Sequence, residues 1–329
     1  METRASSDRS SRSFTDIAKA LLAQNMVLVC LILLIIFFTF KNPAFVSKAN
    51  IITILRQGAC TGILAVGLAH VLIIGGIDLS IGAMISLTSV LGGALMVTHG
   101  WPVWLASLLC IVLITAVGFA AGSIIHFTCM PPLIATLGVQ NVLQGMAFLT
   151  NNGMPIYNIP PLLRVIGQQS TFGIPNPVIV WAFSLLLGWF TLMKTKLGRN
   201  IFAIGSNEEA ARLSGISTFW VRTAAYAICG FYGGVAGVVM TGRLNSGQTN
   251  AGGNLFMDAL TACVIGGISM SGGEGKVPGI IIGIVIMSAL ANGMVAIGLN
   301  SYWQIACKGL LMLFAVGFDS YQRIRKASA

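Results

Sequence analysis

One acidic residue stands between two long apolar runs, and it is the first group in the sequence that could carry chemistry. Asp78 lies in the sequence GGIDLS at residues 75–80. A charge in the middle of a bilayer costs a few kcal/mol, so we expect Asp78 to lie near an interface or to be bonded inside a helix bundle. Asp78 and Ser80 could also cap the helix that follows, because side-chain oxygens accept its free N–H groups. A cap and a polar group in a transport pathway are compatible roles, and both stay open.

Four neutral polar residues in a later apolar run form the second candidate: Thr136, Gln140, Asn141 and Gln144. Three of them, at intervals of four, would lie along one face of a helix. Amides and hydroxyls donate and accept hydrogen bonds without fixed charge, which suits a hydroxyl-rich solute better than an ion. Hydrogen bonding between helices, worth about 0.6 kcal/mol per bond, is the alternative. We expect the stripe as a whole to face a pathway.

A long polar stretch at residues 194–221 carries the signals of a short exposed helix. Its central part, residues 206–216, has the sequence SNEEAARLSGI. Ser206 and Glu209 have capping-box spacing, and acids in a first turn are favoured by the helix dipole. Gly215 could end the helix. A polar helix this short is marginal alone, so a docking partner would explain the signals, whereas a capped surface turn is the simpler alternative.

Membrane-spanning helices must position these groups. Of the 329 residues, 56% are apolar and 9% are charged, whereas soluble chains carry about a quarter charged residues. The apolar residues come in blocks of about 20, the length that a spanning helix needs, and not in the alternating segments of about ten that mark outer-membrane strands. We predict an all-α polytopic membrane protein of about ten transmembrane helices, near residues 20–40, 58–74, 80–97, 102–127, 133–150, 177–193, 221–241, 256–270, 277–298 and 304–319.

The basic residues predict which side of the membrane each loop occupies. Thirteen fall in segments that would be inside, five in segments that would be outside, and Lys308 falls within a span. This excess is the positive-inside pattern, and it places both termini in the cytoplasm. No cleavage site of the A-x-A type follows the first span. The expected organisation is a cytoplasmic tail (1–19), a transmembrane domain (20–319) with a cytoplasmic loop (194–220), and a second cytoplasmic tail (320–329).

Two glycine clusters, at residues 75–76 and 266–273, predict breaks in the helices. Broken helices are tolerated in membranes where they line a cavity or are covered by protein.

Several function classes are disfavoured. The net charge of +10 is dispersed at the ends of apolar blocks, so it does not indicate nucleic-acid binding. Seven cysteines show no metal-ligand spacing, and the sequence GEGK at 273–276 lacks the features of a phosphate-binding loop. We expect no cofactor on this chain and no enzymatic site.

The motifs, taken in order, resemble those of permease subunits of bacterial ATP-driven (ABC) importers, in particular the ribose-type branch. Glu209, Ala210, Ala211 and Gly215 match the E-A-A-x-x-x-G loop of such permeases. The other matching motifs cover most of residues 50–320: GIDLS at 76–80, ATLG at 135–138, NGMPI at 152–156, GRN at 198–200, NEEAARLSGI at 207–216, DA at 258–259, VIGG at 264–267, SGG at 271–273, NG at 292–293 and KG at 308–309. This chain has Phe256 and Gln144 where the family often has Glu and Arg, so details of substrate and gating are not carried over.

The resemblance implies a permease homodimer in the bacterial inner membrane, a cytoplasmic ATPase that uses ATP, and a periplasmic sugar-binding protein. It places Glu209, Ala210, Ala211 and Gly215 in a coupling helix that docks on the ATPase; the predicted helix also includes Ser206, Asn207 and Glu208. The predicted function is import of a monosaccharide, such as a pentose, along a pathway lined by Asp78, Ser80, Thr136, Gln140, Asn141 and Gln144. A carrier driven by ion gradients and a membrane scaffold without a pathway are the alternatives.

Overall fold

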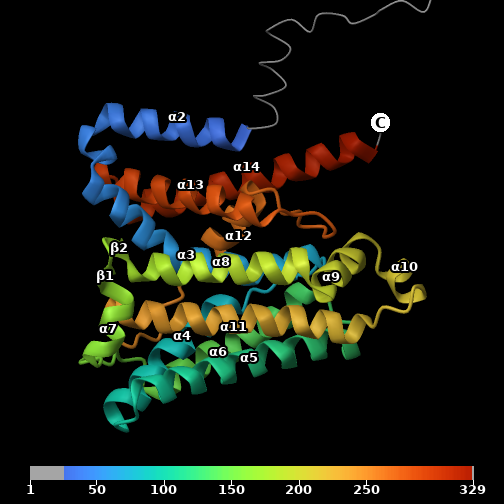
Figure 1. Cartoon of the computed structure of the whole chain (residues 1–329), viewed down its shortest axis with the longest axis horizontal. Coiled ribbons are helices and arrows are strands. Elements are labelled where there is room, and N and C mark those ends of the chain that lie inside the picture. Colours follow the sequence, from blue (N-terminus) through green and yellow to red (C-terminus); the bar gives the residue numbers. More distant parts are fainter. Residues whose placement is uncertain (1–25, 328–329) are drawn as a thin grey trace, which may run out of the picture.

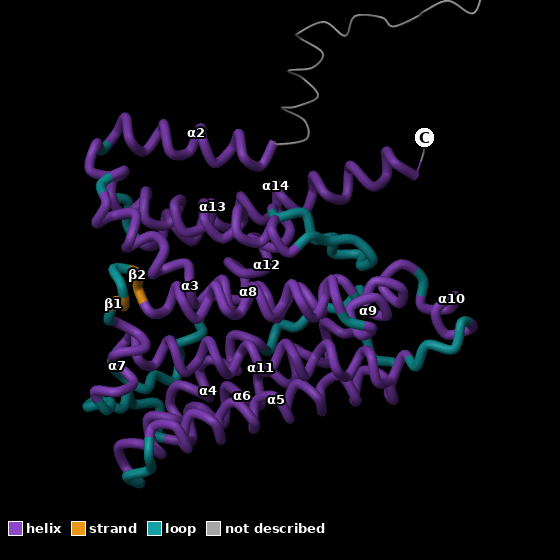
Figure 2. Tube along the Cα trace, in the orientation of Figure 1, coloured by secondary structure: helices purple, strands orange, loops and turns teal. Residues whose placement is uncertain are grey.

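The computed structural model describes residues 26–327 and is almost entirely helical, as predicted (Figures 1 and 2). The predicted tail at 1–19 and the start of the first predicted span lie outside the described residues. The helices are α2 (Met26–Lys41), α3 (Lys48–Ile73), α4 (Ile81–Gly93), α5 (Val103–Thr128), α6 (Pro132–Thr150), α7 (Pro161–Gln168), α8 (Asn176–Lys194), α9 (Lys196–Ser206), α10 (Glu208–Leu213), α11 (Thr218–Leu244), α12 (Leu255–Ile265), α13 (Val277–Ala296) and α14 (Ser301–Ala327). Shorter elements are the 3-10 turn η1 (Pro43–Val46), the π-helical turn η2 (Ala94–Thr98), and a hairpin of β1 (Ser170–Thr171) and β2 (Ile174–Pro175).

A helix occupies each of the ten predicted spans. Within residues 26–327, seven helices are long and apolar enough to cross a membrane: α3, α4 continued by η2, α5, α6, α8, α11 and α13. The prediction for residues 256–270 is wrong in extent, because α12 ends at Ile265 and has 11 residues. Such a helix is about 16 Å long, roughly half of a bilayer core of about 30 Å.

Three helices form the centre of the bundle. In the most apolar 18-residue stretch of each helix, 67% of the residues are buried in α3, 78% in α4 with η2, and 67% in α11. The same fraction is 33% in α5, 22% in α6 and 28% in α8. The peripheral helices expose large side chains such as Trp104, Leu149 and Phe183. Apolar exposure of this kind fits contact with lipid, so α3, α4 and α11 are the scaffold on which polar groups can be held away from lipid.

The two ends of the bundle differ. Figure 1 shows α9, α10 and the end of α14 at one end, and α2 runs towards the opposite end. The turn η1, helix α7 and the β1–β2 hairpin lie at that opposite end, which we call the outer end because the predicted topology places it outside. The end of α14 therefore lies on the same side as the 194–220 loop, as predicted, whereas the predicted N-terminal tail is outside the described residues.

Candidate translocation pathway and coupling site

The first predicted break holds Asp78 in the interior. The chain leaves α3 through Gly75, whose φ of +83° favours glycine, and re-enters a helix at Ile81. Asp78 is fully buried, and its Oδ1 accepts hydrogen bonds from the Ser80 N–H at 2.9 Å and from the Ser80 hydroxyl at 2.5 Å. Its Oδ2 is buried without a hydrogen-bond partner among the described residues. Of the two predicted alternatives, a position near an interface and hydrogen bonding inside the bundle, the second is therefore the one observed for Asp78.

Ser80 does not cap α4 in the predicted way. It occupies the N-cap position, but its side chain accepts no helix N–H, and its hydroxyl donates to Asp78. Hydrogen bonds to a charged acceptor are stronger than those between neutral groups, so this bond fixes the hydroxyl within the short Asp78–Ser80 turn.

Helix α6 brings part of its polar stripe to the break. The Thr136 hydroxyl is buried, accepts the Leu79 N–H at 3.2 Å and donates to the Pro132 carbonyl at 2.9 Å. Gln144, two turns later, donates from Nε2 to the Thr249 carbonyl at 2.8 Å. Both ends of the stripe therefore form hydrogen bonds with backbone groups outside the helices. These bonds hold α6 against its neighbours, which is the packing role that was the alternative to lining a pathway.

The middle of the stripe is more accessible. Gln140 is half-buried on the same face, whereas Asn141 is exposed and lies off it. An exposed amide on a spanning helix is costly against lipid, so this part of α6 requires water or protein beside it.

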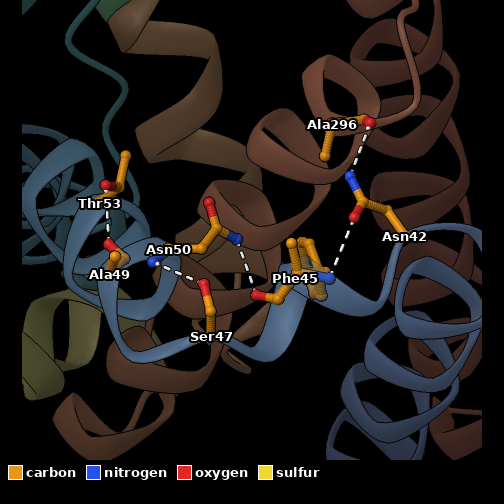
Figure 3. Close-up of a pocket in the computed structure, with 8 residues that line it drawn as sticks. Asn42, Phe45, Ser47, Ala49, Asn50, Thr53 and Ala296 are labelled. Carbon is orange, nitrogen blue, oxygen red and sulfur yellow. Dashed lines mark hydrogen bonds between the residues drawn. The ribbon is translucent and has the colours of Figure 1, made fainter.

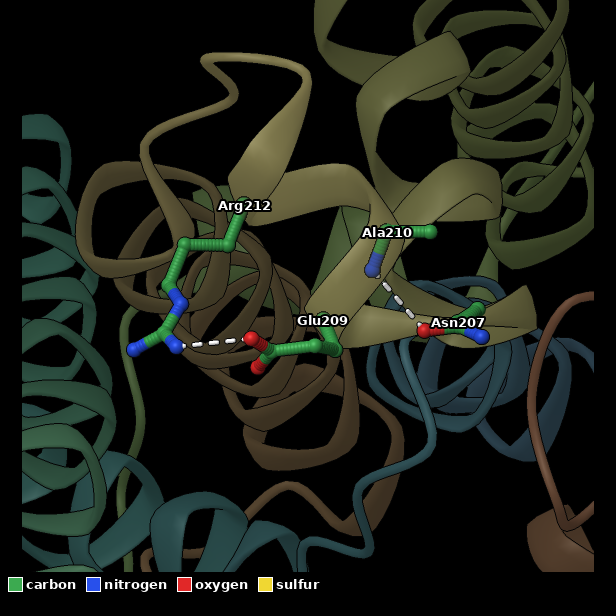
Figure 4. Close-up of polar contacts among 4 residues, drawn as sticks. All are labelled: Asn207, Glu209, Ala210 and Arg212. Carbon is green, nitrogen blue, oxygen red and sulfur yellow. Dashed lines mark hydrogen bonds and ion pairs between the residues drawn. The ribbon is translucent and has the colours of Figure 1, made fainter.

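The loop predicted to be cytoplasmic forms the predicted short helix, α10, which is exposed (Figure 4). Its N-cap is Asn207, whose Oδ1 accepts the Ala210 N–H at 2.9 Å. The predicted capping box is wrong: the Ser206 hydroxyl donates to the Phe202 carbonyl at the end of α9, and Glu209 pairs with Arg212 at 2.8 Å. Serine and asparagine are both favoured at N-caps, but α9 continues through Ser206, so Asn207 is the residue that precedes α10.

The carboxyl end of α10 is closed by Gly215, as predicted. Gly215 has a φ of +81°, and its N–H donates to the Arg212 carbonyl while the Ile216 N–H donates to the Ala211 carbonyl. This is a Schellman motif, in which glycine at the left-handed position satisfies the last carbonyls. Ala211 is buried, whereas Glu208, Glu209, Ala210 and Gly215 are exposed and available to a partner.

Two connections join α10 to the bundle. Glu208 forms an ion pair with Arg222 in the first turns of α11 at 2.6 Å. The end of α9 enters what we call the glycine junction, formed by Ile73, Gly75, Gly205, Gly272 and Gly273. There the Gly273 N–H donates to the Ile73 carbonyl at 2.8 Å, and a Cβ on Gly205 would lie 1.8 Å from that carbonyl oxygen. Both predicted helix breaks thus meet at the end of α9, the helix that leads into α10.

A further site was not predicted from the sequence. Between α11 and α12, residues 245–254 return along α4 without helical structure, and we call them the return segment. The Gln248 N–H donates to Ser89 Oγ at 3.1 Å and the Gly252 N–H to Ser86 Oγ at 3.0 Å. Later residues of the segment contact earlier residues of α4, so the segment runs along α4 in the opposite direction and then leads into α12.

An ion pair stands beside this segment. Lys308 on α14 donates to Asp258 in the first turn of α12 at 2.6 Å, and the two side chains are 25% and 14% exposed. This pair could have been predicted from the sequence, because Asp258 and Lys308 both lie within predicted spans. Charged groups in spans usually face a partner or an aqueous pathway.

The outer end has a separate cavity of about 290 Å³ beside η1 (Figure 3). Its two amides are used in packing: Asn42 donates to the Ala296 carbonyl at 3.1 Å, and Asn50 donates to the Phe45 carbonyl at 2.8 Å and to Asn292 Oδ1 at 2.9 Å. These bonds join α2, α3 and α13 at their outer ends.

Comparison with known proteins gives a consistent result. The family model described as branched-chain amino acid transport system / permease component matches residues 50–316. The chain is 37% identical over 301 residues to the ribose import permease protein RbsC of Bacillus subtilis, covering 91% of this chain and 92% of the relative. It is 35% identical to RbsC of Haemophilus influenzae, covering 91% and 93%, and 31% identical to the xylose transport system permease protein XylH of Escherichia coli, covering 91% and 92%. No solved structure matches the chain.

Proposed function

Because this chain belongs to the family of permease components of bacterial ABC importers, we propose that it conducts a monosaccharide of the ribose or xylose type across the membrane. Members of the family are multi-pass membrane transport subunits and not enzymes. The substrate class is supported by the names of the ribose and xylose relatives and by the neutral amides and hydroxyls along α6.

The observation that carries the coupling role is the exposed, doubly capped α10. An isolated helix of 6 residues is unstable in water, yet α10 is fixed by Asn207 at one end and Gly215 at the other. Its acids lie at its positive end and face solvent. A rigid, exposed helix at the end of the bundle can transmit a push from a docked protein.

The partner would be a cytoplasmic ATPase that binds and hydrolyses ATP, with this chain holding no cofactor. Closure of the ATPase would move α10, and the Glu208–Arg222 ion pair would pass that movement to α11. The glycine junction would pass it to the two helix breaks. A periplasmic sugar-binding protein would deliver the sugar at the outer end, and a second copy of the permease would complete the pathway. Asp78, Ser80, Thr136, Gln140, Asn141 and Gln144 are the proposed polar groups along it.

The test separates docking from folding. We expect Glu209→Lys and Gly215→Asp to insert normally and to lose both ATPase association and sugar uptake. The Glu209–Arg212 pair is exposed, with 65% of the Glu209 side chain accessible, so its loss costs the fold little. Gly215 has no atoms within 4 Å of the position of a Cβ, so Asp meets no neighbour there and only its backbone conformation is strained.

The matched control is Gly298→Asp at the outer end. Gly298 closes α13 with the same hydrogen-bond pattern, has a φ of +79° and also has open space around it. It should lose the same stability and keep ATPase association. Normal uptake by the α10 variants, or equal loss of association in the control, would refute the coupling assignment.

A further inference from the structure

A polar cavity lies where the return segment meets α12 and α14. It has a volume of about 380 Å³, within the range of about 300–1,000 Å³ typical of small-molecule sites. Its lining comes from four parts of the chain: the end of α11, the return segment, the first turn of α12, and Lys308 on α14. None of these residues belongs to the proposed pathway or to the coupling helix.

The backbone of the return segment is held on the side away from the cavity. Ser86 and Ser89 of α4 accept two of its N–H groups, and a Cβ on Gly252 would lie 1.8 Å from the Gly82 carbonyl oxygen. Non-helical backbone at membrane depth is stable only where protein covers it or where it lines an aqueous cavity. Here α4 covers one side, and the cavity occupies the other.

Three neutral amides line the cavity and make few hydrogen bonds to the rest of the protein. Asn250 and Asn254 are exposed, and Gln248 is half-buried, with one bond to Ser246. Asn254 occupies the N-cap position of α12, where asparagine usually accepts a helix N–H, yet it makes no such bond. Its amide therefore remains available to a ligand.

Three charged side chains line the cavity. Lys308 and Asp258 are joined at 2.6 Å, so the cavity presents their ion pair together with the guanidinium group of Arg243. A neutral polyol can accept hydrogen bonds from the ammonium and guanidinium groups and donate to the carboxylate without separating the ion pair. Sugar hydroxyls do both, as do the amides.

We propose that this cavity holds a monosaccharide inside the permease, with its hydroxyls bound by Gln248, Asn250 and Asn254 beside the Asp258–Lys308 pair. The proposal rests on the proposed function for the identity of the solute.

Thiol labelling tests occupancy without requiring transport. The reporter is Leu244→Cys, because Leu244 lines the cavity, is exposed and is not one of the proposed ligands. It is made in a chain whose exposed Cys30 and Cys129 and half-exposed Cys307 are Ser, assembled with its partners in proteoliposomes. We expect millimolar D-ribose or D-xylose to slow alkylation by a small maleimide at least threefold, and L-leucine to have no effect. The control, Gln169→Cys, is exposed on the outer surface outside the cavity and should be unaffected. Absence of protection by either sugar, protection by leucine alone, or equal protection of the control would overturn the proposal.

Uptake by the assembled importer provides the second measurement. The double variant Asn250→Leu/Asn254→Leu removes two amides while leaving α10 and the glycine junction intact. We expect sugar moved per ATP hydrolysed to fall about tenfold, with unchanged ATP hydrolysis stimulated by the binding protein. Unchanged uptake would overturn the cavity proposal. If the unaltered importer moves neither sugar but labelling is still slowed, the proposed transport function fails while the cavity site stands.

Discussion

Gly205→Ala is the sharpest test of the glycine junction. An added Cβ would lie 1.8 Å from the Ile73 carbonyl oxygen and 2.5 Å from the Gly273 nitrogen. Because Cβ contacts below 3.0 Å are essentially never seen, that carbonyl must move away by about 1.2 Å, the difference between 3.0 and 1.8 Å. The same oxygen accepts the Gly273 N–H at 2.8 Å, and a displacement of this size would break the bond.

The expected cost follows from these two effects. Overpacking of a tight contact and loss of a buried backbone hydrogen bond each cost about 1–3 kcal/mol. Both neighbours are backbone atoms, so no rotamer change can relieve the clash. We expect Gly205→Ala to destabilise the chain by about 2–6 kcal/mol, the sum of the two effects, and to lower the amount of sugar moved per ATP, because α9 would no longer pack against the two helix breaks.

The assay combines thermal unfolding in detergent with uptake by the assembled importer. Gly317→Ala is the control, since Gly317 is a helical glycine with no atoms within 4 Å of its Cβ position. It should be neutral or slightly stabilising, as expected for Gly→Ala in a helix. If Gly205→Ala melts and transports like Gly317→Ala, the junction is not a fixed contact and the reasoning fails.

Two further predictions concern single contacts. Thr136→Val should cost about 1–3 kcal/mol in thermal unfolding, because it leaves the Leu79 N–H without its acceptor. Thr150→Val, which removes only a bond within its own helix, should cost less, and equal costs would contradict the assigned role of Thr136. Charge reversal of either Glu208 or Arg222 should lower uptake, and the exchanged pair Glu208→Arg/Arg222→Glu should recover part of it. Additive losses in that double variant would show that the pair does not link α10 to α11.

Elements marked by strong local chemistry could be predicted from the sequence. Apolar blocks of spanning length placed ten helices, and the acids and Gly215 placed α10. The N-cap was misplaced by one residue because Ser206 and Asn207 are both suitable caps. Only the course of α9, which depends on its packing at the glycine junction, decides between them.

The return segment could not be predicted, because its structure depends on distant residues. The turn-forming residues around Asn250 indicate a loop, but they do not show how far that loop lies from the membrane surface. Its descent beside α4 requires the hydroxyls of Ser86 and Ser89, which are about 160 residues earlier in the chain. For the same reason Asp258 could not be paired with Lys308 from spacing alone.

The half-length of α12 also has a consequence for biosynthesis. With 11 residues and a carboxylate in its first turn, α12 is too short to be inserted as an independent span. Its counter-ion Lys308 is 50 residues further along the chain. At about 5–20 residues per second, Asp258 must wait roughly 3–10 s for its partner to be synthesised. Helix α12 therefore becomes stable in the membrane only after α14 has been synthesised, so an ion pair formed late fixes a segment that was made earlier.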